Sequence, residues 1–100
     1  MDFKVTFKHP FLEDLERIVR SLAFHDSVAA QKLGEMIIQT GESLRFFPER
    51  FPAVRQRSGI RRFIVKKHFK VFYRIEHESK TVEILRCWDG RRQTDPTIAP

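Results

Sequence analysis

Residues 59–75, GIRRFIVKKHFKVFYRI, are the most regular stretch of the chain and predict a β-hairpin. Apolar and polar side chains alternate through Ile60–Val65 and again through Phe69–Ile75, as in strands that cover a core. The connecting residues are Lys66, Lys67 and His68. The stretch has seven basic side chains and no acidic one before Glu76, so the hairpin is also strongly positive.

Two further strands and two helices are expected around this hairpin. Phe3–Phe7 alternates in the same way, and its lysines suit an exposed sheet edge. Thr81–Trp88 follows the polar turn EHESK. The resulting order is β-α-α-β-β-β. It predicts an α+β fold in which a helical hairpin packs on one face of a four-stranded, largely antiparallel sheet, with the other face partly open.

Apolar residues spaced three or four positions apart indicate the two helices. In the first, which begins near Pro10, they are Phe11, Leu12, Leu15, Ile18, Val19 and Leu22. In the second, which Asp26 or Ser27 can cap, they are Ala30, Leu33, Ile37, Thr40, Leu44 and Phe47. Gly41 is unfavourable inside a helix, and a close helix–helix approach would compensate for it. Pro48 and Pro52 end the second helix. The expected core is Leu15, Ile18, Leu22, Leu33, Ile37, Leu44, Val71, Tyr73 and Ile84.

Length and composition predict one soluble domain over residues 1–95, followed by a short tail over 96–100. The chain has 100 residues, of which 41% are hydrophobic and 32% charged. It has no apolar run long enough to span a bilayer, and its N-terminus lacks the apolar stretch of a secretion signal. Cys87 is the only cysteine, which excludes an intrachain disulfide. We therefore expect a cytoplasmic protein that does not bind membranes.

The net charge of +6 is unevenly distributed along the chain. Residues 1–44 contain five Lys/Arg and seven Asp/Glu, whereas residues 45–92 contain fourteen and five. This asymmetry indicates a polyanionic partner, either nucleic acid or an acidic protein segment. The alternative is a solvated surface that only maintains solubility.

Four segments together resemble the RelE/ParE superfamily of toxins from bacterial type II toxin–antitoxin modules. They are DLERIVRSL, SLRFFPERFP, IRRFIVKKHFKVFYRI and VEILRCWDGRR. The resemblance extends from Phe3 to about Asp95. It implies a growth-inhibiting toxin, of a kind associated with plasmid stabilization, that is neutralised by a cognate antitoxin and contacts operator DNA only through that antitoxin. RelE-like members cleave mRNA on the ribosome, and ParE-like members inhibit DNA gyrase.

The basic residues of the RelE branch have counterparts here, but its proton-transfer group does not. Arg61, Lys70 and Arg91 match the positions that would stabilise a cleaved phosphate. No Tyr or His follows the terminal arginines, in RRQTDPTIAP. Tyr73 is interpreted as a core residue and Asp89 as a turn residue, with His68 and His77 on the surface. The pattern favours the ParE-like branch, or a member whose nuclease activity is weak or lost.

The residues expected to contact the target are basic or aromatic: Arg61, Arg62, Lys70, Arg74, Trp88, Arg91 and Arg92. The alternative for each basic residue is a solvated surface position, and a tryptophan such as Trp88 more often closes the rim of the sheet. Cys87 is expected to be a buried thiol on the face opposite to Trp88. No cofactor or metal is expected. A gyrase inhibitor, a ribosome-dependent mRNA endonuclease and a non-toxic basic binding module remain as hypotheses, with gyrase or the ribosome and its mRNA as the target.

Overall fold

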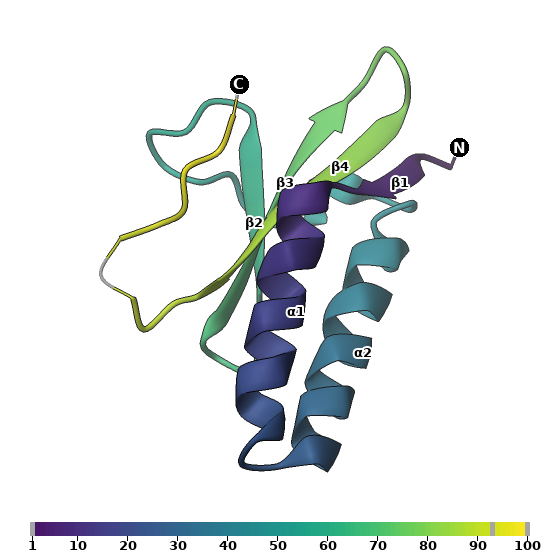
Figure 1. Cartoon of the computed structure of the whole chain (residues 1–100). Coiled ribbons are helices and arrows are strands. Elements are labelled where there is room, and N and C mark those ends of the chain that lie inside the picture. Colours follow the sequence, from purple (N-terminus) through teal and green to yellow (C-terminus); the bar gives the residue numbers. More distant parts are fainter. Residues whose placement is uncertain (1, 93, 100) are drawn as a thin grey trace.

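The computed structural model describes residues 2–92 and 94–99, and it has the predicted order of elements (Figure 1). Met1, Gln93 and Pro100, which fall within the predicted domain and tail, lie outside the described residues. The elements are β1 (Lys4–Phe7), α1 (His9–Ala23), α2 (Ser27–Ser43), a short 3-10 helix (Pro48–Arg50), β2 (Ile60–Val65), β3 (Phe69–Glu76) and β4 (Thr81–Asp89).

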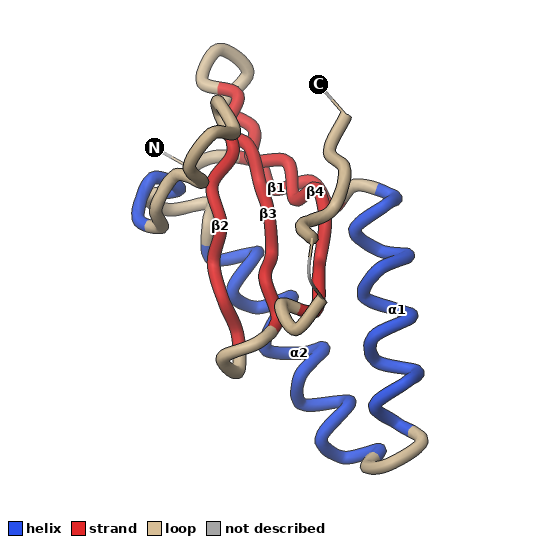
Figure 2. The backbone as a smooth tube through the Cα atoms, turned by 90° about the vertical axis from the view of Figure 1, so that its left-hand side faces the viewer, coloured by secondary structure: helices blue, strands red, loops and turns tan. Residues whose placement is uncertain are grey.

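The four strands form one mixed sheet in the order β1-β4-β3-β2. The last three strands form an antiparallel meander, while β1 runs parallel to β4 at the sheet edge. Figure 2 shows the sheet face-on, with α1 alongside β4 and α2 behind the strands. The predicted fold class is confirmed.

The main core lies between the helices and one face of the sheet. Val71, Tyr73 and Ile84 are fully buried there, together with Leu33, Ile37 and Leu44 of the helical hairpin. Leu15, Ile18 and Leu22 of α1 pack against this core but are only half-buried. The fully buried positions of α1 are instead Phe11 and Asp14.

The second helix ends earlier than its apolar spacing predicts. It stops at Ser43, after which Phe47 adopts a left-handed conformation with φ 50° and is 81% exposed. Placing Phe47 in the buried helical stripe was therefore wrong. The Asp26 cap is confirmed, because its side chain accepts a hydrogen bond from the Ala29 amide at 3.0 Å.

Gly41 allows a close approach, but to the sheet rather than to the other helix. A Cβ atom at this position would lie 3.0 Å from the Phe7 ring. The glycine at the helix–helix contact is Gly34, where a Cβ atom would lie 3.4 Å from Val19. The expected helix–helix role of Gly41 is therefore corrected to a helix–strand role.

The face of the sheet opposite the helices is covered in part by the C-terminal segment 94–99, which is called the tail from here on. A second apolar cluster forms there from Ile60, Phe72 and Leu85, with Val54, Trp88 and Ile98 packed against it. Arg86 donates to the Thr97 carbonyl at 2.8 Å, and Arg74 donates to the Ala99 carbonyl at 3.4 Å. This face is therefore less open than the sequence suggested.

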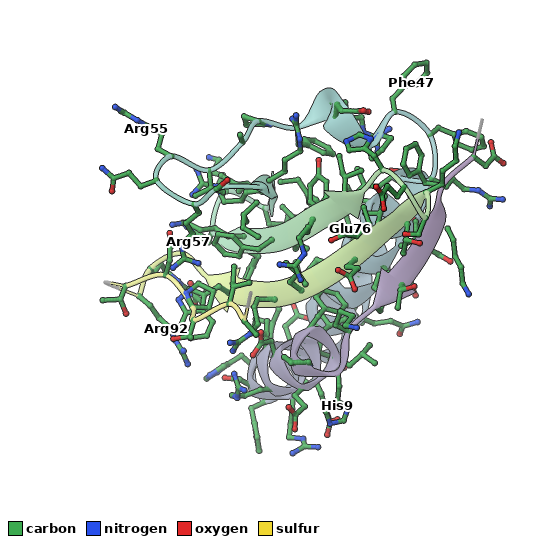
Figure 3. All side chains as sticks on the ribbon, turned by 90° about the horizontal axis from the view of Figure 1, so that it is seen from above. His9, Phe47, Arg55, Arg57, Glu76 and Arg92 are labelled. Atoms are coloured by element: carbon green, nitrogen blue, oxygen red, sulfur yellow. The ribbon has the colours of Figure 1, made fainter. Side chains whose placement is uncertain are left out.

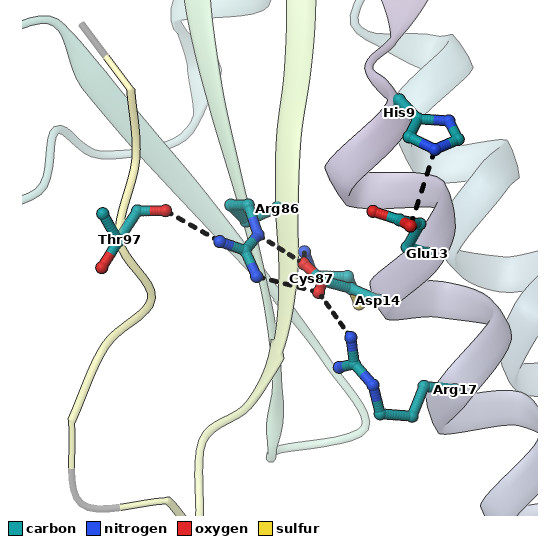
Figure 4. Close-up of polar contacts among 7 residues, drawn as sticks. All are labelled: His9, Glu13, Asp14, Arg17, Arg86, Cys87 and Thr97. Atoms are coloured by element: carbon teal, nitrogen blue, oxygen red, sulfur yellow. Dashed lines mark hydrogen bonds and ion pairs between the residues drawn. The ribbon is translucent and has the colours of Figure 1, made fainter.

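Asp14 joins α1 to the free edge of β4 (Figure 4). Its carboxylate accepts two hydrogen bonds from the Arg86 guanidinium, at 2.7 and 2.9 Å, and one from the Cys87 amide at 3.1 Å. Asp14 is only 1% exposed, and its charge is balanced by the bidentate pair with Arg86. The same carboxylate also satisfies the Cys87 amide, which β1 is too short to reach.

Candidate functional site

Four of the seven predicted target-binding residues lie together at the C-terminal end of β4. Lys70 and Trp88 are register partners on β3 and β4, and Arg91 and Arg92 follow directly after β4. We call these four residues the basic rim. Gly90 permits the turn that places the two arginines, because a Cβ atom there would lie 2.6 Å from the His68 carbonyl oxygen.

Arg91 is held by Asp89, which is the turn residue that the sequence predicted. Its guanidinium donates to both carboxylate oxygens, at 3.0 and 2.7 Å, and its backbone amide donates to Oδ1 at 3.0 Å. The hydrogen bond from Arg91 lowers the pKa of Asp89, and the same bond raises the pKa of Arg91. Asp89 therefore stays ionised and is a weak proton acceptor.

Trp88 is already engaged within the chain. The guanidinium of Arg92 lies 4.2 Å from the Trp88 ring centroid and that of Arg86 lies 5.3 Å away. The indole Nε1 donates to the Thr94 carbonyl at 2.7 Å. Lys70 likewise pairs with Asp95 of the tail at 3.1 Å. The tail therefore holds the side chains of Trp88 and Lys70 in place and covers the sheet around Trp88.

A hollow of about 440 Å³ separates the basic rim from the C-terminal half of α1. Ile18, Leu22 and Phe69 contribute apolar side chains to its lining, and Arg91 and Arg92 contribute charge. Arg17 of α1 and His25, in the turn between α1 and α2, also line the hollow. Sequence reasoning missed both, since exposed polar residues on a helix or in a turn give no sign of which strand end they will face.

Arg61 is not part of the basic rim. It lies on the helix-covered face of β2, paired in register with Tyr73, and its Nη1 donates to the carbonyls of Glu49 and Phe51 at 3.0 and 2.6 Å. Nearby, the Tyr73 hydroxyl donates to the Pro48 carbonyl at 2.6 Å. Arg61 therefore anchors the loop that precedes β2.

The two remaining predicted residues lie on the tail-covered face of the sheet. The Arg62 amide donates to the Pro52 carbonyl at 3.1 Å. Arg74 makes an ion pair with Glu83 at 3.3 Å. The seven predicted residues thus form one cluster of four and three separate positions.

Burial makes the tyrosine and the cysteine poor proton-transfer groups. Desolvation raises the pKa of Tyr73 to about 12 and that of Cys87 to about 12. Cys87 is fully buried on the face opposite to Trp88, as predicted. Among residues 2–92 and 94–99, no group of three His, Cys, Asp or Glu side chains could hold a metal ion. In that same part of the chain, no helix has the length and apolar character needed to cross a membrane.

A family model supports the sequence resemblance. The model for the ParE toxin of type II toxin–antitoxin systems (parDE) matches residues 5–94. The chain belongs to the ParE toxin family. No curated protein matches this ParE-family sequence.

Solved structures of related toxins share the fold of this ParE-family chain. The P. aeruginosa chromosomal ParDE system gives a TM-score of 0.74 at 17% identity, covering 87% of this chain and 95% of that one. The RelBE2 toxin–antitoxin complex of Mycobacterium tuberculosis gives a TM-score of 0.69 at 20% identity, covering 89% of this chain and 99% of that one. The isolated E. coli RelE toxin gives 0.57 at 13% identity, covering 91% and 87%. The fold is therefore common to both branches of the superfamily.

Proposed function

We propose that this ParE-family toxin acts in the cytoplasm by inhibiting DNA gyrase, and that a cognate antitoxin neutralises it. Structural relatives described as toxin–antitoxin complexes support the antitoxin as a partner. The observation that carries the gyrase proposal is the chemistry of the basic rim. Asp89 positions Arg91, and Trp88 positions Arg92. The hydrogen bond from Arg91 lowers the pKa of Asp89, so this side chain remains a carboxylate. Such a surface suits binding to an anionic partner better than it suits proton transfer.

A gyrase supercoiling assay with purified protein tests this proposal directly. The wild-type toxin should inhibit supercoiling, and Arg91→Ala combined with Arg92→Ala should weaken inhibition at least tenfold. Arg20→Ala is a matched control, because Arg20 is an equally exposed arginine that pairs with Glu16 on α1, away from the rim. Unimpaired supercoiling in the presence of wild-type protein would refute the gyrase assignment.

One observation favours a RelE-like mRNA endonuclease as the second candidate. His25 lines the same hollow as Arg17, Arg91 and Arg92, so an imidazole is available beside three guanidinium groups. If this candidate is correct, a purified translation system should show cleavage of mRNA on the ribosome. His25→Ala should then abolish cleavage, and His77→Ala, in the β3–β4 turn, should leave it unchanged.

A further inference from the structure

Phe47 adopts a backbone conformation that its own side chain disfavours. Its φ and ψ are 50° and 61°, in the left-handed region, and it precedes Pro48. Bulky residues rarely adopt positive φ, and the residue before a proline favours extended conformations with negative φ. Phe47 is therefore an unfavourable choice for this position.

The turn itself has a structural purpose, but that purpose does not require a phenyl ring. The left-handed residue directs the chain so that Pro48 is buried and its carbonyl accepts the Tyr73 hydroxyl at 2.6 Å. Glycine or asparagine would adopt this conformation at lower free energy. The aromatic side chain must be explained by something other than the turn.

Packing within the monomer does not explain the ring either. Phe47 is 81% exposed, whereas Phe51, four residues later, packs on Phe63 with ring centroids 5.3 Å apart. Phe46 beside it is half-exposed. Two adjacent exposed phenylalanines form an apolar protrusion of the kind that partner proteins cover.

The surroundings of this protrusion are partly apolar and electrically balanced. Arg45 lies over the Phe46 ring and also lines a hollow of about 270 Å³ beside β1, to which Phe3, Val5 and Phe7 contribute apolar side chains and Lys4 and Glu42 contribute charged ones. The exposed charges of this region are three of each sign: Asp2, Glu42 and Glu49 against Lys4, Arg45 and Arg50. In Figure 3, Phe47 projects outward on the side of Glu76, whereas Arg92 lies on the opposite side of the fold.

We propose that Phe46, Phe47 and the hollow beside β1 form a docking surface for apolar side chains of the antitoxin, separate from the surface that meets the target. This inference rests on the proposed function, in which the anionic target meets the basic rim. A partly apolar surface at the opposite end, with charges of both signs in balance, lacks the net positive charge that such a target requires. It suits instead a protein segment that inserts apolar side chains into the hollow and covers both rings.

Binding of the toxin to the product of the small reading frame adjacent to its gene tests the proposal. Phe47→Gly and Phe47→Asn should each raise the Kd of that complex at least tenfold. Both should leave the thermal midpoint of the free toxin unchanged or higher, because they relieve the backbone conformation. Phe24→Ala is the matched control: Phe24 is 85% exposed at the tip of the helical hairpin, and its replacement should not change the Kd.

Three results would overturn the inference. In the first, both Phe47 variants bind the antitoxin as tightly as Phe24→Ala does. In the second, they lose growth inhibition in cells without the antitoxin, which would assign the surface to the target. In the third, wild-type toxin forms a dimer that Phe47→Asn dissociates, which would assign it to self-association. Failure of the proposed function is distinguishable, because wild-type protein would then neither inhibit growth nor bind the neighbouring product.

Discussion

The two faces of the sheet are closed in different ways. On the helix-covered face, Val71, Tyr73, Ile84 and Cys87 are all fully buried beneath two long helices. On the opposite face, a short tail covers three buried side chains. The tail is held by hydrogen bonds that the sheet donates to its carbonyl oxygens and by the pairing of its Asp95 with Lys70. The difference indicates that the helix-covered face supplies most of the folding free energy, whereas the tail-covered face organises the basic rim.

Removing a side chain from the helix-covered face should have the largest effect on stability. Ile37→Ala should lower the free energy of unfolding by about 2–5 kcal/mol, because Ile37 is fully buried and its loss leaves a cavity. Urea denaturation would measure the change. Leu15→Ala, at a half-buried position of α1, should have a smaller effect. Equal losses at the two positions would contradict the burial described for α1.

Breaking the connection between α1 and β4 should have the next largest effect. Asp14→Ala removes the acceptor of two Arg86 hydrogen bonds and of the Cys87 amide, which should lower the unfolding free energy by about 1–3 kcal/mol. Glu16→Ala removes an exposed carboxylate from the same helix and should change stability by less than about 0.5 kcal/mol. A similar result for both variants would show that the Asp14 pair contributes little.

High pH should destabilise the fold through two buried groups on its helix-covered face. The pKa values of Tyr73 and Cys87 are raised to about 12 in the folded state, from ordinary values of 10.0 and 9.0. The unfolded chain therefore loses these protons first, and stability falls as pH rises from about 9 towards 12. Urea midpoints at pH 8 and pH 11 would show the decrease, and Tyr73→Phe together with Cys87→Ala should reduce it. An equal decrease in that double variant would show that other groups cause the loss of stability.

Substitutions in the tail should have the smallest effect on stability and a clear effect on the rim. Ile98→Ala should lower the unfolding free energy by about 1 kcal/mol, because Ile98 is only half-buried against the second cluster. Since Trp88 is the only tryptophan and its indole donates to Thr94, its fluorescence should shift to longer wavelength as the tail loosens. Unchanged fluorescence would show that the tail does not order the basic rim.

The sequence predicted most of the fold because each element carries its own periodicity. The hairpin of β2 and β3, both helices and the edge strand β1 follow from local spacing alone. Contacts between distant segments were not predictable in this way. The helix end before Phe47 depends on Tyr73 binding Pro48, and the hollow beside the rim depends on how Arg17 and His25 face β4.

One missed contact did leave a signal in the sequence. Asp14 lies three residues after Phe11 and four before Ile18, within the apolar stripe of α1. A buried carboxylate at such a position requires a cationic or hydrogen-bonding partner. Its partner, Arg86, lies 72 residues further along the chain, so spacing could not identify it.

The pairing of the first strand with the last has a consequence for synthesis on the ribosome. Lys4 pairs with Thr81 and Phe7 with Ile84, so β1 has no neighbour in the sheet until β4 has been made. The central strand β3 also waits for β4 on one side. Nascent chains that end before β4 cannot complete the sheet, and the rim arginines come later still. Translation must therefore be almost finished before the sheet can close, so the basic rim forms only at the end of synthesis.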